Sequence, residues 1–228
     1  MSLKIKNKSW NTTKTNDSWS LFKIMGEFVK GYEKMGSIGP CVSIFGSART
    51  DPKNKYYILA TETAKAITNS GYGIITGGGP GIMEAANKGA QEVNGTSVGL
   101  NIALPFEQNH NPFIDQDKNL SFEYFFIRKV MFVKYAQAFV VMPGGFGTLD
   151  ELFESITLIQ TKKITPIPII LVGVEFWSGL IDWIKESLIV NKLISPEDLD
   201  LFSVVDTKEE VLQRIEDFYS KEVYRPNF

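Results

Sequence analysis

Short apolar runs alternate with longer segments of helical periodicity over most of this chain. The runs predict strands at 41–46, 72–76, 97–103, 121–126, 137–142, 167–173 and 202–205. The periodic segments predict helices near 54–70, 80–93, 127–135, 149–162, 176–190 and 207–220. Strands that are apolar along nearly their whole length are typical of parallel sheets covered on both faces. The alternation therefore predicts an α/β fold: a Rossmann-like, doubly wound, mainly parallel sheet of about seven strands with helices on both faces.

The 228 residues suit one domain with additions at its ends. Residues 1–17 are polar and basic, and we expect them to form a flexible tail. Between Ser18 and Met35 apolar residues recur at helical spacing, which predicts an added N-terminal helix over 18–36, capped by Asp17 or Ser18. No linker or internal repeat interrupts the rest of the sequence, so we expect 18–228 to form a single domain.

Composition narrows the range of functions. With 24 Lys and Arg against 26 Asp and Glu, the formal charge of −2 argues against binding to nucleic acid or to an anionic membrane. The longest apolar run, 167–174, is too short to cross a bilayer, and no signal peptide is evident, so we expect a cytoplasmic protein. A single cysteine, Cys41, and a single histidine, His110, leave no Cys/His metal site and little material for a Ser/His/Asp triad.

Two glycine-containing loops follow the first two predicted strands, and ligands of doubly wound folds bind at such carboxyl ends. Gly46 and Ser47, with Arg49 nearby, could meet an anion or could simply connect strand to loop. The run 77–81, which includes Gly78 and Gly79, opens a helix and could hold an anion or a ribose. It is not a dinucleotide fingerprint, because it follows the second strand and Glu84 stands where the third glycine belongs. The alternative is a tight strand–helix turn.

The loop after the predicted strand 137–142 carries the densest set of phosphate-binding features. Gly144, Gly145 and Gly147 precede a helix, and Thr148, expected at its N-cap, could offer its hydroxyl to a phosphate oxygen. No Lys-Ser/Thr follows, so the loop is not a Walker A motif. The competing interpretation is a capping box, in which Thr148 and Glu151 satisfy the first N–H groups of the helix.

Two adjacent cations, Arg128 and Lys129, stand at the predicted start of another helix. Positive charge there opposes the helix dipole, which favours a bound anion or a carboxylate partner over a purely local stabilising role. The polar loop 104–111, which includes Glu107 and His110, is expected at the same edge of the sheet. We expect His110 to be a loop residue rather than a catalyst.

Together these residues resemble the LOG family, the cytokinin riboside 5′-monophosphate phosphoribohydrolases and nucleotide nucleosidases once labelled lysine decarboxylases. The hallmark P-G-G-x-G-T-x-x-E of that family is matched by 143–151, and its Arg-Lys pair by Arg128 and Lys129. The glycines at 77–79, with Gly81 and Met83, match as well. The resemblance covers roughly residues 40–205.

The resemblance implies a homodimeric hydrolase that cleaves the N-glycosidic bond of a nucleoside 5′-monophosphate, giving free base and ribose 5-phosphate. Arg128 and Glu151 would be the catalytic pair, and neither a metal nor an organic cofactor is implied. The residues expected to bind substrate are Gly46, Ser47, Gly78, Gly79, Glu84, Glu107, Lys129, Gly144, Gly145, Gly147 and Thr148. The segment from Gly79 to Ala85 resembles bacterial nucleotide nucleosidases, so AMP is expected as a substrate alongside cytokinin riboside 5′-monophosphates.

Two other functions remain open on the same residues. A decarboxylase would need pyridoxal phosphate on a lysine, and no lysine of this chain stands out for that role. A non-catalytic protein that binds a nucleotide or molybdenum cofactor could use the same fold and glycine loops. The presence of both Arg128 and Glu151 favours an enzyme over such a carrier.

Overall fold

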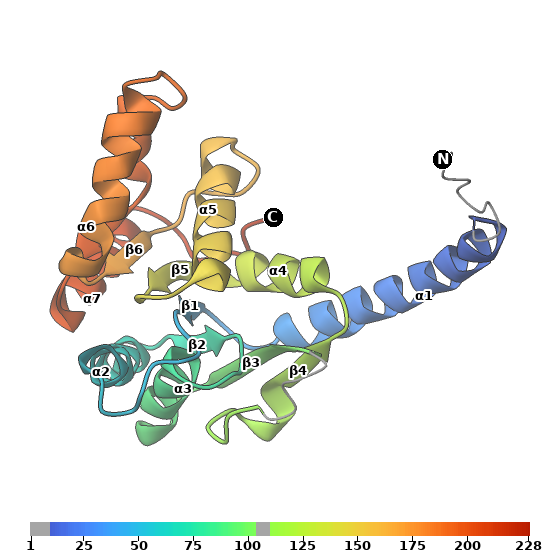
Figure 1. The fold of residues 1–228 in the computed structure, drawn as a ribbon. Helices are drawn as coiled ribbons and strands as arrows, with labels where there is room; N and C mark the ends of the chain where they lie inside the picture. The colour runs from blue at the N-terminus through green and yellow to red at the C-terminus, as the bar shows by residue number, and fades with distance from the viewer. Residues whose placement is uncertain (1–9, 104–109) are drawn as a thin grey trace.

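A computed structural model describes residues 10–103 and 110–228, and it is built around one seven-stranded sheet (Figure 1). The strands are β1 (Cys41–Phe45), β2 (Gly73–Thr76), β3 (Ser97–Ile102), β4 (Asn119–Phe122), β5 (Ala136–Val141), β6 (Ile169–Val172) and β7 (Ser203–Val205). Their order is β4-β3-β2-β1-β5-β6-β7, and every neighbouring pair is parallel. The predicted α/β fold with a parallel sheet is confirmed.

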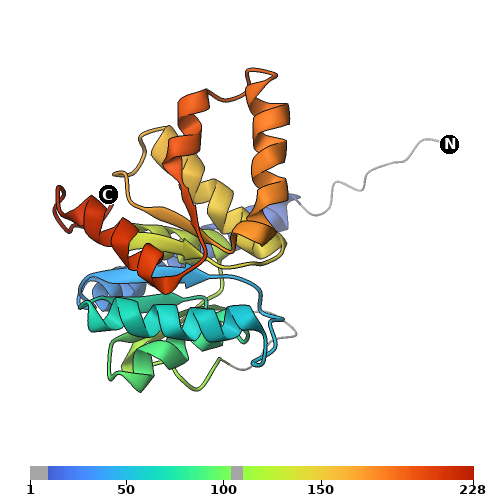
Figure 2. The same cartoon turned by 90° about the vertical axis from the view of Figure 1, so that its left-hand side faces the viewer.

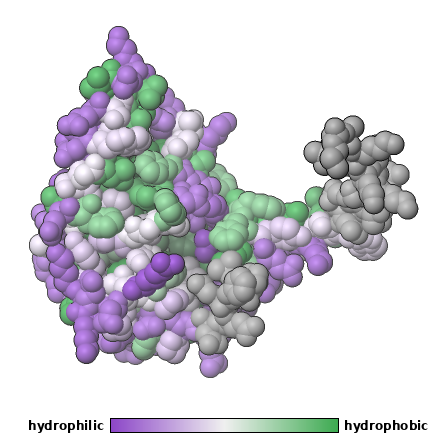
Figure 3. Space-filling model, viewed as in Figure 1, coloured by the Kyte–Doolittle hydropathy of each residue, from purple (hydrophilic) through white to green (hydrophobic). Residues whose placement is uncertain are grey.

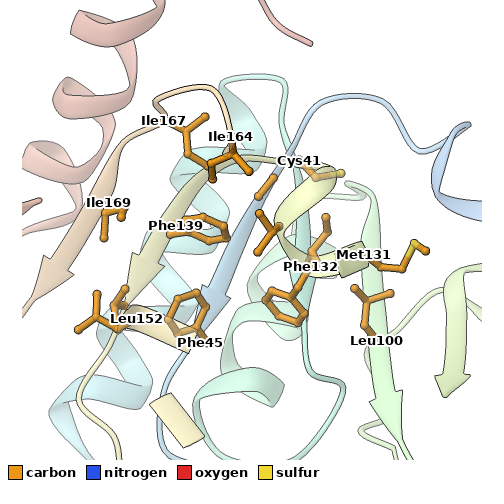
Figure 4. Close-up of a cluster of buried hydrophobic side chains, with 14 of the residues drawn as sticks. Cys41, Phe45, Leu100, Met131, Phe132, Phe139, Leu152, Ile164, Ile167 and Ile169 are labelled. Atoms are coloured by element: carbon orange, nitrogen blue, oxygen red, sulfur yellow. The ribbon is translucent and has the colours of Figure 1, made fainter. Parts of the chain in front are cut away.

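Helices cover both faces of this sheet because successive strand residues point to opposite sides. Val42 and Ile44 of β1 pack with helices α2 (Lys55–Asn69), α3 (Ile82–Glu92) and α7 (Lys208–Tyr219). Cys41 and Phe45 pack on the other face with α1 (Trp10–Met35), α4 (Phe125–Lys134), α5 (Phe146–Gln160) and α6 (Val174–Trp183). Figure 4 shows Phe45 and Phe132 in this second cluster, and Figure 2 shows α2 and α3 on the side of the sheet away from α5. The strands are therefore buried from both sides.

Most predicted elements are present, and their ends differ by a few residues from the predicted ones. The 3₁₀ helices η1 (Gln116–Lys118) and η3 (Pro196–Leu201) were not predicted, whereas the helix predicted at 176–190 is present as α6 continued by the π-helical turn η2 (Ile184–Ile189). In the part of the chain that the structure describes, no helix combines the length and apolar character needed to span a membrane.

The N-terminal helix begins earlier than predicted. Helix α1 starts at Trp10, so residues 10–17 are helical rather than part of a flexible tail, and residues 1–9 lie outside the described residues. The expected cap at Asp17 or Ser18 was therefore wrong, because a short polar residue can cap a helix but does not by itself end one. The helix is roughly 39 Å long at 1.5 Å per residue, and its N-terminal part projects beyond the sheet (Figure 1).

Candidate active site

A pocket of about 650 Å³ opens at the carboxyl ends of β1 and β5. These strands are neighbours, yet the chain leaves them toward opposite edges of the sheet, which makes this the topological switch point where such folds bind ligands. Its walls come from the loops after β1, β2 and β5 and from helices α3, α4 and α5. The lining residues are Phe45, Gly46, Ser47, Ala48, Arg49, Gly77, Met83, Arg128, Phe132, Gly145, Phe146, Gly147, Thr148 and Glu151.

The main chain of Ser47 joins the loop after β1 to the loops that follow β5 and β2. Its N–H donates to the carbonyl of Pro143 at 3.0 Å, and its carbonyl accepts from the N–H of Ile82, also at 3.0 Å. Pro143 opens the loop after β5, and Ile82 is the first residue of α3. The three loops are therefore fixed relative to one another by the backbone.

Helix α5 starts at the pocket with an open N-terminus. Its N-cap is Gly145, no side chain caps it, and the N–H of Leu149 closes the first turn on the carbonyl of Gly145 at 3.0 Å. The first N–H groups of a helix have no partner within it, and they favour an anion. A Cβ atom on Gly144 would collide with the Thr148 hydroxyl, so the chain needs glycine there to enter the helix.

The expected N-cap at Thr148 is wrong, and so is the competing interpretation of Thr148 and Glu151 as a capping box. Thr148 is the third residue of α5 and not its N-cap, because the helix already begins at Phe146. This start leaves Thr148 facing the pocket and places Glu151 in the second turn, where its carboxylate is free to meet a side chain from another helix. The local stabilising role that competed with catalysis for Glu151 is thereby removed.

Arg128 in the first turn of α4 and Glu151 in α5 meet across the pocket. The Arg128 Nη2 atom lies 3.2 Å from Glu151 Oε1, and the two side chains are 15% and 8% exposed. The Arg128 guanidinium also stacks over Phe125, with 5.2 Å between its Cζ atom and the ring centroid. The predicted carboxylate partner of Arg128 is therefore present, and it is Glu151.

Burial sets the electrostatics of this pair. It raises the pKa of Glu151 above the ordinary value of 4.5, while the charges of Arg128 and Lys129 act in the opposite direction. Within residues 10–103 and 110–228, the buried Nε atom of Arg128 has no hydrogen-bond partner. The site thus offers a carboxylate with raised proton affinity beside a cation that retains an unused donor.

Lys129 is not brought to the pocket, although it adjoins Arg128 in sequence. Its Nζ atom lies 2.7 Å from Asp150 Oδ2 and 2.6 Å from Glu154 Oε2, and it lines a separate groove along α5. Successive helix residues point about 100° apart, so two neighbours on α4 face different sides of α5. The expected substrate contact of Lys129 is not supported by this placement.

Of the loop after β2, only part of the glycine run lines the pocket. Gly77 lines the pocket, but Gly78, Gly79 and Glu84 do not. Glu84 accepts a hydrogen bond from the Tyr57 hydroxyl at 2.9 Å. Gly78 has a positive φ of 76°, which glycine adopts without strain. Of the other predicted substrate contacts, Glu107 lies outside the described residues.

A buried amide network holds this loop. Asn87 of α3 accepts from the Thr76 hydroxyl at 2.5 Å and from the Asn111 side-chain amide at 3.0 Å. Asn111 also donates from its side chain to the carbonyl of Gly79 at 3.0 Å, and from its main chain to the carbonyl of Gly78 at 2.9 Å. Sequence reasoning missed this network, because the three side chains come together only in the folded chain.

The apolar residues that line the pocket were also not predicted from the sequence. Phe45, Met83, Phe132 and Phe146 line the pocket, and Phe146 is 92% exposed at its mouth. Phe45 ends β1 directly before Gly46, so its position at the carboxyl end of a predicted strand was a signal for it. Flat apolar surfaces of this kind suit an aromatic ring.

The cysteine of this chain does not line the pocket. Cys41 is buried in the sheet, and burial raises its pKa to about 12, so its thiol stays protonated. Among the described residues, no group of three or more His, Cys, Asp or Glu side chains is arranged to hold a metal ion.

Known protein sequences point to one family. The model of a family described as "Possible lysine decarboxylase" matches residues 83–215, more than half of the chain. A cytokinin riboside 5′-monophosphate phosphoribohydrolase of Mycobacterium tuberculosis is 30% identical over 162 residues, which cover 68% of this chain and 82% of that protein. A probable enzyme of the same name from Oryza sativa is 25% identical, over 78% of this chain and 72% of its own length.

Solved structures share the fold. A molybdenum cofactor binding protein of Rippkaea orientalis aligns with a TM-score of 0.57 at 19% identity, covering 79% of this chain and 97% of that one. The molybdenum cofactor carrier protein of Chlamydomonas reinhardtii aligns with a TM-score of 0.53 at 21% identity, covering 80% and 99%. These likenesses show the architecture alone. The sequence matches go further, and the chain belongs to the LOG family, described by its family model as possible lysine decarboxylases.

Proposed function

We propose that this protein hydrolyses the N-glycosidic bond of nucleoside 5′-monophosphates and releases free base and ribose 5-phosphate. The observation that carries the proposal is the buried Arg128–Glu151 pair, which shares one pocket with the open N-terminus of α5. A phosphate group and a glycosidic carbon can therefore be bound in the same cavity. The names of the sequence relatives support the same reaction class.

The 5′-phosphate is bound at the start of α5. Gly144, Gly145 and Gly147 let the backbone approach the phosphate closely, and the unpaired N–H groups with the Thr148 hydroxyl donate to its oxygens. Binding energy from this remote group positions C1′ of the ribose. The base lies against the apolar walls of the pocket.

Glu151 acts at C1′. As the C1′–N bond breaks, its electron pair leaves with the base and positive charge develops on the ribose, which the carboxylate stabilises. Water then forms the new C1′–O bond and gives one proton to the carboxylate, the carboxylate releases that proton to solvent, and the departing base takes up one proton from solvent, so the atoms balance and Glu151 is regenerated. Arg128 holds Glu151 in place at 3.2 Å. Of the remaining predicted contacts, Gly46 and Ser47 line the same pocket, which supports a role in binding substrate.

AMP and cytokinin riboside 5′-monophosphates are the proposed substrates, and the proposed assembly is a homodimer, as the family resemblance implies. The experiment is a panel of AMP, adenosine, other 5′-monophosphates and isopentenyl-AMP, with free base measured by chromatography. We expect monophosphates to exceed the matching nucleosides in kcat/KM by about 100-fold or more, the effect of about two charge-assisted hydrogen bonds.

Two results of this panel would contradict the proposal. If adenosine and AMP are turned over equally, the start of α5 does not bind a phosphate. If several monophosphates bind without any release of base, the protein is a non-catalytic nucleotide carrier, the alternative that the fold also allows.

The raised pKa of Glu151 predicts the pH dependence. Glu151 acts as a carboxylate, so the rate falls as pH drops through its pKa, and burial places that pKa above 4.5. We therefore expect the midpoint of the acidic limb of kcat to lie above pH 4.5. The kcat profile is the one to measure, because it reports groups of the enzyme–substrate complex rather than free substrate. A midpoint at or below 4.5, with protein fluorescence unchanged, would show that a different group controls the rate.

A further inference from the structure

Helix α1 carries an apolar surface that its own chain leaves uncovered. Phe22, Met25, Val29 and Tyr32, here called the outer seam, are 66%, 54%, 65% and 42% exposed. Their spacing of three, four and three residues is that of the a and d positions of a coiled coil. Trp19, which is 69% exposed, extends the outer seam and packs against Phe22 with 6.0 Å between ring centroids and the rings tilted by 53°.

The other side of α1 already has a partner. Ile24 and Phe28 pack against the core cluster of this chain, and Met35 is buried in it. Gly31 lies so close to α4 that a Cβ atom there would sit 2.8 Å from Met131 Cε. The outer seam is thus a second apolar face, and it stays largely exposed although the Tyr32 ring contacts Phe28 and the Lys134 ammonium.

The attachment of α1 to the body ends before its N-terminal part. Glu27 accepts from the N–H of Glu123 at 2.7 Å, and Lys23 lies 3.9 Å from Glu123. Beyond these contacts the helix projects from the sheet (Figure 1). Isolated helical segments are marginal in water, and most helices in proteins are stabilised by packing of an apolar face. We therefore expect the projecting part to be stabilised by packing against a partner.

The chemistry of α1 favours a second copy of the chain as that partner. Helix α1 carries four lysines against two glutamates and one aspartate, so its charges nearly balance and it lacks the strongly basic surface that binds anionic lipid or nucleic acid. A seam of aromatic and aliphatic side chains at coiled-coil spacing is complementary to an identical seam related by a two-fold axis.

The area is sufficient for a dimer. Each side chain of the outer seam and Trp19 exposes roughly 100 Å², so two copies would bury roughly 1,000 Å² between them, the lower bound for a specific interface. Figure 3 shows hydrophobic surface that continues from the body onto the root of the projecting helix.

We propose that the outer seam of α1 forms a dimer contact with the outer seam of a second copy. The proposal names the surface of the expected homodimer and stands whether or not the protein hydrolyses nucleotides. Its test is the mass of the full chain, measured by sedimentation velocity between about 0.1 and 100 μM. We expect the wild type to be a dimer and the variant Phe22→Glu/Val29→Glu to dissociate at least about 100-fold more readily.

Lys30→Glu is the matched control. Lys30 is exposed and points roughly 120° around α1 from the centre of the outer seam, so this variant also adds negative charge to the helix but should remain a dimer. Circular dichroism and thermal melting establish that each variant is folded. A wild type that is monomeric throughout overturns the proposal, and so does a double variant that dimerises as tightly as the wild type.

A membrane is the other occupant to be tested. Wild-type protein is mixed with vesicles of phosphatidylcholine and phosphatidylglycerol and then sedimented. We expect it to stay in the supernatant as a dimer. Sedimentation with the vesicles that is lost in Phe22→Glu/Val29→Glu would assign the outer seam to lipid and overturn the dimer contact.

Discussion

Replacing Glu151 by glutamine is expected to lower kcat for base release about 10³-fold, within the range seen when an electrostatic or proton-transfer group is removed. Glutamine keeps the size of the side chain and can still accept from Arg128 Nη2, which lies 3.2 Å from the carboxylate oxygen in the wild type. It cannot take a proton from water or balance positive charge at C1′. The measurement is kcat for AMP, together with a melting curve to show that the fold is kept.

Glu154→Gln is the control for this substitution. Glu154 lies on the same helix and contacts Lys129 outside the pocket, so its loss should leave kcat within a few-fold of the wild type. Equal losses in the two variants would indicate a general disturbance of α5. A Glu151→Gln variant that retains a tenth or more of wild-type kcat would remove Glu151 from the reaction.

Replacing Arg128 by alanine is expected to lower kcat/KM about 10²-fold and to move the acidic limb of the kcat profile to higher pH. The direction follows from the pair itself, because the charge of Arg128 lowers the pKa of Glu151 against the effect of burial. Without that charge, the buried carboxyl holds its proton to a higher pH. Arg128→Lys keeps a cation but loses the planar donor fork. Compared with Arg128→Ala, it should bring the acidic limb part of the way back to its wild-type pH and recover little of the rate.

Lys129→Met separates the role of Arg128 from that of general positive charge. Lys129 adjoins Arg128 and also lowers the pKa of Glu151, but its ammonium is bound to Asp150 and Glu154. We expect this variant to shift the acidic limb less than Arg128→Ala and to retain most of the activity. If Arg128→Ala leaves both the rate and the limb unchanged, Arg128 does not position Glu151.

Much of the fold could be predicted because its information is local. Continuous apolar runs such as 137–142 are recognisable one by one, and their alternation with helices limits the sheet to a parallel form. The order of the strands could not be predicted, because β1 pairs with β5 through residues nearly one hundred positions apart. The start of α1 was misplaced for a local reason: capping residues mark where a helix can begin, not where it must.

In the candidate site too, local features could be predicted from the sequence, and contacts between distant elements could not. The glycine loop before α5 could be found from residue types alone, whereas the contact of Arg128 with Glu151 depends on how α4 and α5 cross the sheet. Residue spacing alone does not determine whether a capping box forms. The pattern Thr-x-x-Glu forms a capping box at Thr207 and Glu210, where α7 begins directly after the threonine, but not at Thr148, where the helix has already begun.

The junction at Ser47 has a consequence for how the site can change in evolution. Both hydrogen bonds that join the three loops belong to the backbone of Ser47, so most side chains could replace the serine without separating them. Proline is the exception, because it lacks the N–H that donates to Pro143. Position 47 can thus vary in the chemistry that it offers a ligand while the surrounding framework persists, which makes it a natural point for diverging substrate preference.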